Sequence, residues 1–131
     1  MIVLDASAVL ELILRSPRGE RVKDRIAPAA ETLHAPDLLD LEVAQLLRRY
    51  EEMGNLTASS ARAALDDLAD LDAERYPHDL FLPRIWELRK NATAYNASYL
   101  ALAEALEAPL LTADRRMASM PGHHARVEVL R

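Results

Sequence analysis

The sequence predicts an α/β fold with a central, mostly parallel sheet flanked by helices. Two short apolar runs carry this prediction, Ile2–Leu4 and Leu110–Thr112, because an acid and then a helical pattern follow each of them. Such runs are typical of strands that are buried on both faces. Strand patterns that alternate with helical patterns indicate βαβ units. The 131 residues suffice for one domain, 1–131, with its own core.

The first half of the chain alternates in this way. Apolar residues dominate the expected helix 6–15, and Ser16-Pro17 ends it, with Pro17 suited to the first turn of a polar helix 17–26. A short strand at 32–35 closes at Pro36. Asp37 is the expected N-cap of a helix to Met53, which Gly54-Asn55 ends, and residues 57–71 return as an antiparallel helix.

The second half repeats the alternation. We expect a strand at 74–77, then a helix to Lys90 with Pro83 in its first turn. Thr93 caps a helix to Glu107, and a short helix begins at Asp114. The alternating residues 126–130 are the last expected strand.

Composition narrows the environment and the chemistry. The chain has no cysteine, which excludes disulfides and thiolate zinc sites. It has no signal-peptide pattern, and Glu104 and Glu107 interrupt its longest apolar stretch, so we expect a cytoplasmic protein that does not span a membrane. The net charge of −5 argues against binding nucleic acid by bulk electrostatics, but a bound dication would invert the local field.

Two acids follow the ends of predicted parallel strands. Asp5 follows the first strand and Asp114 follows Leu110–Thr112, so both should lie at the carboxyl edge of the sheet, where ligands bind in open α/β folds. Each also stands at the start of a helix, and the alternative is that each is only an N-cap.

Two further polar side chains lie on expected helices. Glu42 falls at the edge of an apolar helix face, where a carboxylate is usually paired, metal-bound or protonated. Its alternative is a structural ion pair with Arg49 or another basic group. Asn96 lies three residues after Thr93, and its alternative is to reach back in a capping box.

The segments that contain these residues resemble the four signature segments of PIN-domain ribonucleases, above all the VapC toxins of VapBC toxin–antitoxin pairs. The likeness extends over essentially the whole chain and implies a three-layer PIN-like fold. The matching segments are Val3–Val9, Leu39–Val43, Thr93–Ala97 and Leu111–Asp114.

The resemblance also implies residue roles. Asp5, Glu42 and Asp114 would be metal-site acids for Mg²⁺ or Mn²⁺, with Ser7 and Thr112 as supporting hydroxyls. At Asn96 this sequence departs from the usual Asp, which leaves an oxygen ligand but removes a charge.

By the same resemblance we expect a metal-activated water to hydrolyse RNA, and we expect a homodimer with a VapB-type antitoxin. The apolar groove expected between the early helices would bind that antitoxin. Candidates for holding the RNA backbone are Arg15, Arg89, Arg115 and Arg116.

Two other functions compete with this one. A catalytically weak PIN module, marked by Asn96, would act mainly through antitoxin binding. A haloacid-dehalogenase-like phosphatase would need a second acid where Ser7 stands. The three glycines form no phosphate-binding loop, which argues against a nucleotide-binding protein.

Overall fold

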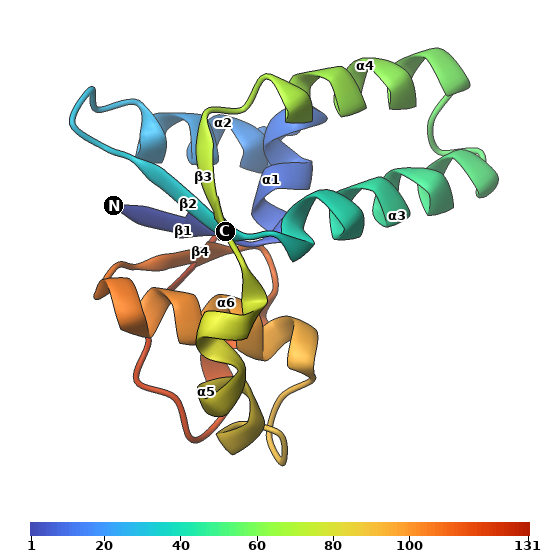
Figure 1. Cartoon of the computed structure of the whole chain (residues 1–131). Coiled ribbons are helices and arrows are strands. Elements are labelled where there is room, and N and C mark those ends of the chain that lie inside the picture. Colours follow the sequence, from blue (N-terminus) through green and yellow to red (C-terminus); the bar gives the residue numbers. More distant parts are fainter.

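The protein consists of a five-stranded sheet between two layers of helices (Figure 1). The computed structural model describes every residue, Met1–Arg131. The sheet order is β3-β2-β1-β4-β5 and all neighbouring strands are parallel, so the predicted three-layer α/β fold is confirmed. The strands are β1 Ile2–Leu4, β2 Leu33–Pro36, β3 Ala73–Tyr76, β4 Leu110–Thr112 and β5 Val127–Val129.

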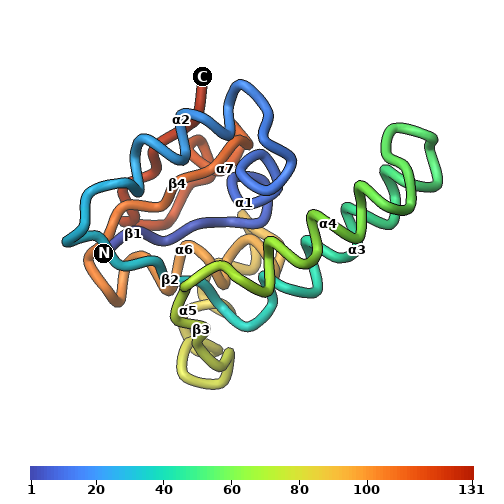
Figure 2. The backbone as a smooth tube through the Cα atoms, turned by 90° about the horizontal axis from the view of Figure 1, so that it is seen from above, coloured from blue at the N-terminus to red at the C-terminus, as the bar shows by residue number.

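Seven α-helices and one 3₁₀ turn complete the fold. Helices α3 and α4 form the predicted antiparallel hairpin, which projects from the body of the molecule (Figure 2). Gly54 turns the chain between them with a positive φ of 78°. None of the helices has the length and apolar character that crossing a membrane requires. The bounds are α1 Ala6–Ile13, α2 Pro17–Ile26, α3 Leu38–Glu52, α4 Ala58–Ala69, η1 His78–Phe81, α5 Leu82–Glu87, α6 Ala94–Leu106 and α7 Arg115–Ser119.

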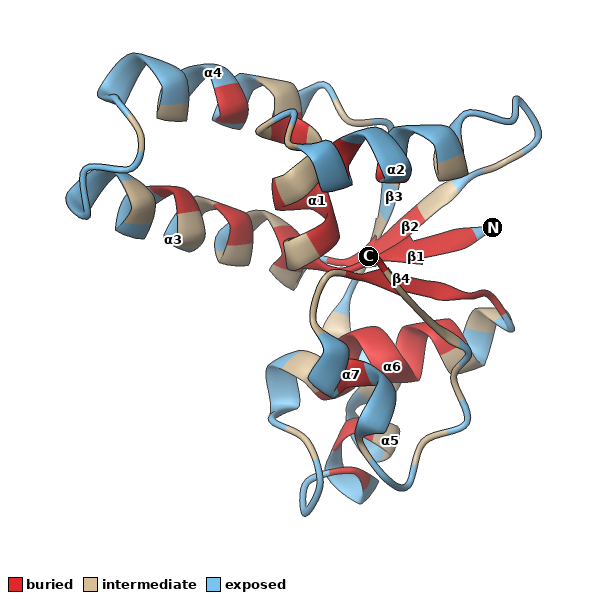
Figure 3. Cartoon of the chain, turned by 180° about the vertical axis from the view of Figure 1, so that it is seen from behind, coloured by how far each residue is buried: buried red, intermediate tan, exposed pale blue.

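Strands β1 and β4 are fully buried because both faces of the sheet are covered, and Thr112 is their one polar residue (Figure 3). Side chains alternate between the faces of a strand. Ile2 and Leu4 accordingly pack into a core with helices α1 to α4, whereas Val3 packs into a second core with α5 and α6. In β4, Leu111 packs into the first core and Leu110 into the second. The carboxyl ends of β1 and β4 therefore meet at one edge, between the two layers of helices.

The start of α3 differs from the sequence prediction. Asp37 occupies the predicted N-cap position, but it has helical backbone angles and its side chain makes no capping hydrogen bond, so the expected capping contact does not form. Instead, the Leu38 N–H donates to His78 Nε2 at 2.9 Å. His78 lies in η1, far along the chain, and a contact between distant segments of this kind leaves no local signal in the sequence.

Candidate active site

Asp5 lies directly after the central strand β1 and is almost fully buried, with 4% of its surface exposed. Its backbone is extended, and its Oδ1 accepts a hydrogen bond from the Ala8 N–H at 3.0 Å, so it caps α1. The capping alternative is thus correct for Asp5, but it accounts for only part of the contacts of this carboxylate.

Two hydroxyls bind the same carboxylate. Ser7 Oγ donates to Asp5 Oδ1 at 2.6 Å, and Thr112 Oγ1 donates to Asp5 Oδ2 at 2.5 Å. These hydroxyls also accept backbone N–H groups at the end of β4, Ser7 from Ala113 at 2.9 Å and Thr112 from Asp114 at 3.0 Å. The structure therefore brings both predicted supporting hydroxyls to Asp5 and ties the ends of β1 and β4 together.

The electrostatic state of Asp5 follows from this burial. Desolvation raises the pKa of its carboxyl, and the nearby Asp114 charge raises it further, while the hydrogen bonds from Ser7, Thr112 and Ala8 oppose the shift. Hydroxyls and an amide stabilise a carboxylate less than a cation does. Asp5 is thus a buried acid without a cationic partner in the protein.

Glu42 reaches the same region from α3. Its Oε1 accepts a hydrogen bond from the buried Tyr99 hydroxyl at 2.6 Å, and no ion pair with Arg49 forms. Burial raises the pKa of Glu42, and the charge of Asp5 adds to this effect, whereas the Tyr99 hydrogen bond opposes it. The second oxygen, Oε2, makes no hydrogen bond within the protein, and it is available to a ligand.

Asp114 lies at the end of β4 and caps α7, so the capping alternative is correct here as well. Its environment is different from that of Asp5, because Arg116 donates from Nε to Oδ1 and from Nη2 to Oδ2, both at 3.1 Å. Hydrogen bonding to Arg116 holds the pKa of the Asp114 carboxyl below its usual range. The guanidinium of Arg116 therefore already binds the carboxylate that was predicted to bind a metal ion.

Asn96 lies in the first turn of α6, where its backbone N–H donates to the capping Thr93 Oγ1 at 3.1 Å. The side-chain amide makes no hydrogen bond within the protein, so the capping box does not form. Asn96 precedes Tyr99 by three residues, which puts both on one face of the helix, and Tyr99 contacts Glu42. The free amide therefore lies on the helix face that carries Tyr99, the partner of Glu42.

The donor chemistry of these four side chains fits a hard divalent cation. Carboxylate and amide oxygens are the ligands that Mg²⁺ and Mn²⁺ prefer. As arranged here, however, no three acidic or histidine side chains lie close enough together to hold a metal ion. Arg116 binds both oxygens of Asp114, and Tyr99 binds one oxygen of Glu42, so closing a ligand set requires Asp114 to leave Arg116 and the acids to move closer together.

The predicted RNA-binding arginines do not all lie near the candidate site. Arg116 binds Asp114 at the candidate site, and Arg115, the residue before it in α7, is exposed. Arg89 stacks over the Trp86 ring, 4.6 Å from its centroid. Arg15 lies beyond the far end of α1 from Asp5 and pairs with Asp67 at 3.6 Å. The structure thus brings only the α7 pair of arginines to the acidic edge.

Of two hollows in the surface, only the smaller adjoins this region. One of about 600 Å³ lies between α1, α2 and α4, where the sequence predicts an apolar groove. Only three of its nine lining residues are hydrophobic, so its rim is more charged than expected. A second hollow, of about 340 Å³, lies between α3 and Tyr95 and includes Glu42 in its wall.

Sequence reasoning missed Tyr99, which is 1% exposed and fixes one oxygen of Glu42. The available signal was its position, three residues after Asn96 on the same helix face. A buried tyrosine needs a hydrogen-bond partner for its hydroxyl, and Glu42 is that partner.

Comparison with known proteins identifies relatives of the chain. A sequence model described as PIN domain matches residues 2–122. Ribonuclease VapC9 from Mycobacterium tuberculosis is 45% identical over 117 residues, which cover 89% of this chain and 88% of that protein. Ribonuclease VapC12 from the same species is 37% identical over 130 residues, 99% of both chains. The crystal structure of VapBC2 from Rickettsia felis, bound to a DNA fragment from their promoter, superimposes with a TM-score of 0.73 over 100% of both chains at 14% identity, which is a likeness of fold.

Proposed function

The chain belongs to the PIN-domain family and, within it, to the VapC ribonucleases, and from this premise we propose that it is an endoribonuclease toxin that depends on Mg²⁺ or Mn²⁺. One observation above all supports the proposal. Asp5 is a buried carboxylate at the carboxyl edge of a parallel sheet, held by two hydroxyls and lacking a cationic partner in the protein. Because a buried, unpaired charge is costly, a cation bound there would stabilise it.

Asp5, Glu42, Asn96 and Asp114 would hold the metal through their oxygens. A bound Mg²⁺ or Mn²⁺ supplies a Lewis acid for the phosphate and lowers the pKa of a coordinated water. Ser7 and Thr112 orient the Asp5 carboxylate. Glu42 would offer the metal its Oε2, which is free of hydrogen bonds within the protein, while Tyr99 keeps Oε1 in position.

Arg115 and Arg116 are the cations nearest this edge, and we infer that they hold phosphates of the RNA. Arg116 would leave Asp114 when the metal binds, which frees its guanidinium for a phosphate. Arg89 and Arg15 lie elsewhere on the surface, and a contribution from them would come only from a longer RNA.

We also propose a VapB-type antitoxin as the partner. Solved relatives of the same fold are VapBC toxin–antitoxin proteins. The hollow between α1, α2 and α4 combines an apolar floor with cations and acids at its rim, which suits an amphipathic segment of a partner chain. By family likeness we expect a homodimer, and the RNA substrate implies action in the cytoplasm.

A second candidate function is a catalytically weak module that acts mainly by binding the antitoxin. Two observations favour it. Asn96 brings no charge to the site, and no three acids or histidines lie at ligating distance as the side chains stand. A site with three negative charges instead of four should bind a divalent cation less tightly.

RNA cleavage by antitoxin-free protein, with and without Mn²⁺, separates the two candidates. We expect Mn²⁺-dependent cleavage that Asp5→Ala abolishes, and we expect Asn96→Asp to increase both cleavage and Mn²⁺ affinity, roughly tenfold for one added carboxylate ligand. Asp37→Ala is a matched control, because Asp37 also begins a helix but makes no capping bond. Absence of cleavage by the parent protein, with activity gained on Asn96→Asp, would favour the weak module.

A further inference from the structure

The first turn of α3 is held by the short segment Arg75–His78, at the end of β3 and the start of η1. The backbone carbonyl of Tyr76 accepts the Asp37 N–H at 2.9 Å. The imidazole of His78, 40 residues after Leu38, accepts the Leu38 N–H through Nε2 at 2.9 Å. The segment that follows the edge strand β3 therefore fixes the point at which α3 begins.

His78 supplies the cap that α3 lacks at its own N-cap residue. The first-turn N–H groups of a helix have no partner within the helix. The N-cap side chains of α1, α2, α4 and α6 each accept one of these groups, whereas Asp37 makes no such bond in α3. A side-chain cap typically changes the folding equilibrium by about a factor of five. In α3 this contribution comes from a histidine that is distant in the sequence.

Only the neutral ring of His78 can make this contact. A neutral imidazole has one N–H and one acceptor nitrogen, and Nε2 is the acceptor here, so the proton is on Nδ1. The protonated ring has two donors and no acceptor. Its charge would also lie at the positive end of the α3 dipole. Uptake of a proton therefore removes the cap and adds a repulsion.

The surroundings of His78 offer no bound carboxylate that would compensate for this loss. The hollow that His78 lines contains no charged side chain, and its other titratable group is Tyr95 of α6, while α5 contributes Leu82 and Ile85. The charged side chains of η1, β3, α5, α6 and the first turn of α3 are exposed or bound to one another: Asp37, Glu74 and Asp79 are exposed, Arg75 binds Asp40, and Arg84 binds Glu87 and Glu104.

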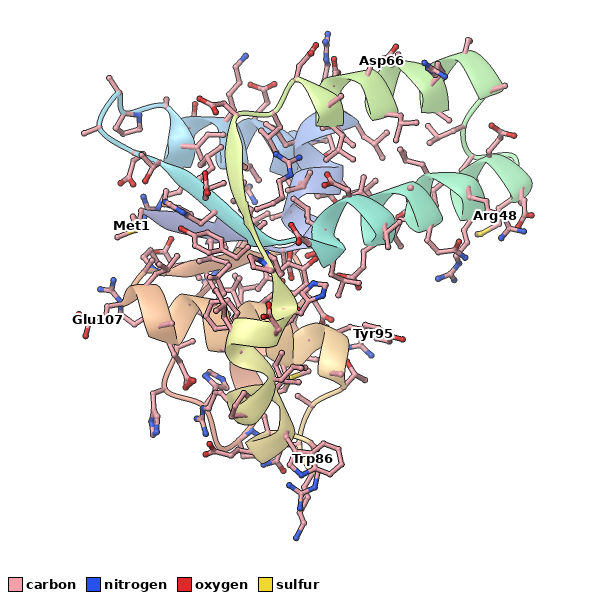
Figure 4. The ribbon with its side chains drawn as sticks, viewed as in Figure 1. Met1, Arg48, Asp66, Trp86, Tyr95 and Glu107 are labelled. Atoms are coloured by element: carbon pink, nitrogen blue, oxygen red, sulfur yellow. The ribbon has the colours of Figure 1, made fainter.

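Glu42 lies one turn after Leu38. In an α-helix each N–H bonds the carbonyl four residues earlier, so the residue that His78 holds is the one to which the Glu42 N–H bonds. Tyr99 fixes the Oε1 atom of the Glu42 carboxylate at 2.6 Å. Beyond its packing against α1 and α4, the helix projects from the body, and Arg48 lies toward its outer end (Figure 4). The first turn of α3 is therefore where the sheet sets the position of Glu42.

We propose that His78 is a positioning residue for Glu42, in which the neutral imidazole holds the start of α3 and protonation releases it. The proposal rests on the proposed function as a metal-dependent ribonuclease, and it adds a residue that touches neither the metal nor the RNA. The consequence is a metal site that is assembled at the upper end of the range in which histidine ordinarily titrates, about pH 5 to 8, and loosened at the lower end.

Two substitutions of His78 test this pH dependence through the Mn²⁺ affinity. Glutamine offers an acceptor oxygen near the place of Nε2 and takes up no proton in this range, whereas leucine offers no acceptor. His78→Leu should bind Mn²⁺ roughly fivefold more weakly than His78→Gln at every pH. The parent should match His78→Gln at about pH 8 and His78→Leu at about pH 5. A parent that keeps the same ratio to both variants at all pH values would overturn the proposal.

Thr57→Ala is the matched control for loss of a cap. Thr57 Oγ1 accepts the Ser60 N–H at 3.1 Å at the start of α4, and neither residue belongs to the proposed site. Thr57→Ala and His78→Leu should both shift the urea midpoint downward, but only His78→Leu should weaken Mn²⁺ binding by the folded protein. Equal weakening by both would indicate general destabilisation, and no weakening by either would indicate a purely structural cap.

A double-mutant cycle tests whether His78 acts through Glu42. In a Glu42→Gln background, His78→Leu should cause little further loss of Mn²⁺ affinity, because the ligand that it positions is already gone. A full, additive loss would mean that His78 acts on a different ligand, and the proposal would be wrong.

Nuclear magnetic resonance in EDTA separates this proposal from the ribonuclease function. The Leu38 amide shift should follow the titration of the His78 ring, and it should not move in this way in His78→Gln. An amide that ignores the titration overturns the proposal. If the amide and the Mn²⁺ affinity respond as expected but no RNA is cut, the positioning role stands and the ribonuclease proposal fails. If the parent binds no Mn²⁺, both fail.

Discussion

The ends of β1 and β4 are built from the same pattern and have opposite electrostatic properties. Each strand is short and buried, and an acid that caps the next helix follows it, directly at Asp5 and after one residue at Asp114. Asp5 is buried and bound only by hydroxyls and an amide, and its pKa is raised. Asp114 is partly exposed and bound by Arg116, and its pKa is lowered.

The difference shows that the pattern fixes the location of an acid but not its charge state. Location follows from strand order, since β1 is central and β4 is its neighbour. Charge state follows from the partners, and these come from residues that the pattern does not specify. We infer that Asp5 is the acid that most needs an external cation, whereas Asp114 already has one.

The largest expected effect comes from Asp5→Asn compared with Asp114→Asn. Asparagine also caps helices, and the Thr112 hydroxyl can turn its proton from Asp5 toward Ser7, 3.2 Å away, and accept from the new amide. We expect Asp5→Asn to lower Mn²⁺ affinity at least about a hundredfold, measured by calorimetry. We also expect it to increase the unfolding free energy by about 1 kcal/mol at pH 7, because it removes a buried charge.

The pH dependence in EDTA gives the sign of each charge effect. The raised pKa of Asp5 means that the parent loses stability relative to Asp5→Asn as pH rises through the folded-state pKa. The lowered pKa of Asp114 means that the parent loses stability relative to Asp114→Asn as pH falls below about 4, the ordinary Asp value, and through the folded-state pKa. Urea unfolding of the parent and the two variants across this pH range measures both effects. If the unfolding free energies of all three changed with pH in the same way, the predicted difference between Asp5 and Asp114 would be contradicted.

The elements and the region of the site were predictable from local sequence patterns, whereas its pairings were not. Apolar strands and helix punctuation predicted all five strands and the edge where Asp5 and Asp114 lie. The partner of Glu42 was not predictable, because Tyr99 lies 57 residues away and Arg49 is nearer in sequence. A pairing depends on the packing of distant helices, and no periodicity encodes it.

Thr112→Val tests the link between the two strand ends. Thr112 is fully buried and donates to Asp5 while it accepts from the Asp114 N–H. Valine keeps the shape and removes both hydrogen bonds. We expect Mn²⁺ affinity to fall about tenfold and the unfolding free energy to fall by about 1–2 kcal/mol.

Thr112→Ser is the matched control for this substitution. Serine retains the hydroxyl and should bind Mn²⁺ nearly as the parent does. Parent-like binding by Thr112→Val, measured in the same titration, would mean that the hydroxyl does not orient Asp5, and that the two strand ends act independently.

The smallest expected effect concerns Arg116, because its bond to Asp114 gives the end of β4 a cation that the end of β1 lacks. As long as Arg116 binds both oxygens of Asp114, a metal ion must displace it. Its side chain is 86% exposed, so the competition is weakened by solvent. We expect Arg116→Gln to increase Mn²⁺ affinity a few-fold in electron paramagnetic resonance titrations of free Mn²⁺.

Arg115→Gln separates this competition from a general change of charge. It removes the same charge one residue earlier, and Arg115 makes no ion pair with Asp114, so its effect on Mn²⁺ affinity should be smaller. Both substitutions should raise KM for RNA if both arginines hold phosphates. A drop in Mn²⁺ affinity on Arg116→Gln would show that Arg116 orients Asp114 for the metal instead of competing with it, and the contrast between the strand ends would then be one of exposure alone.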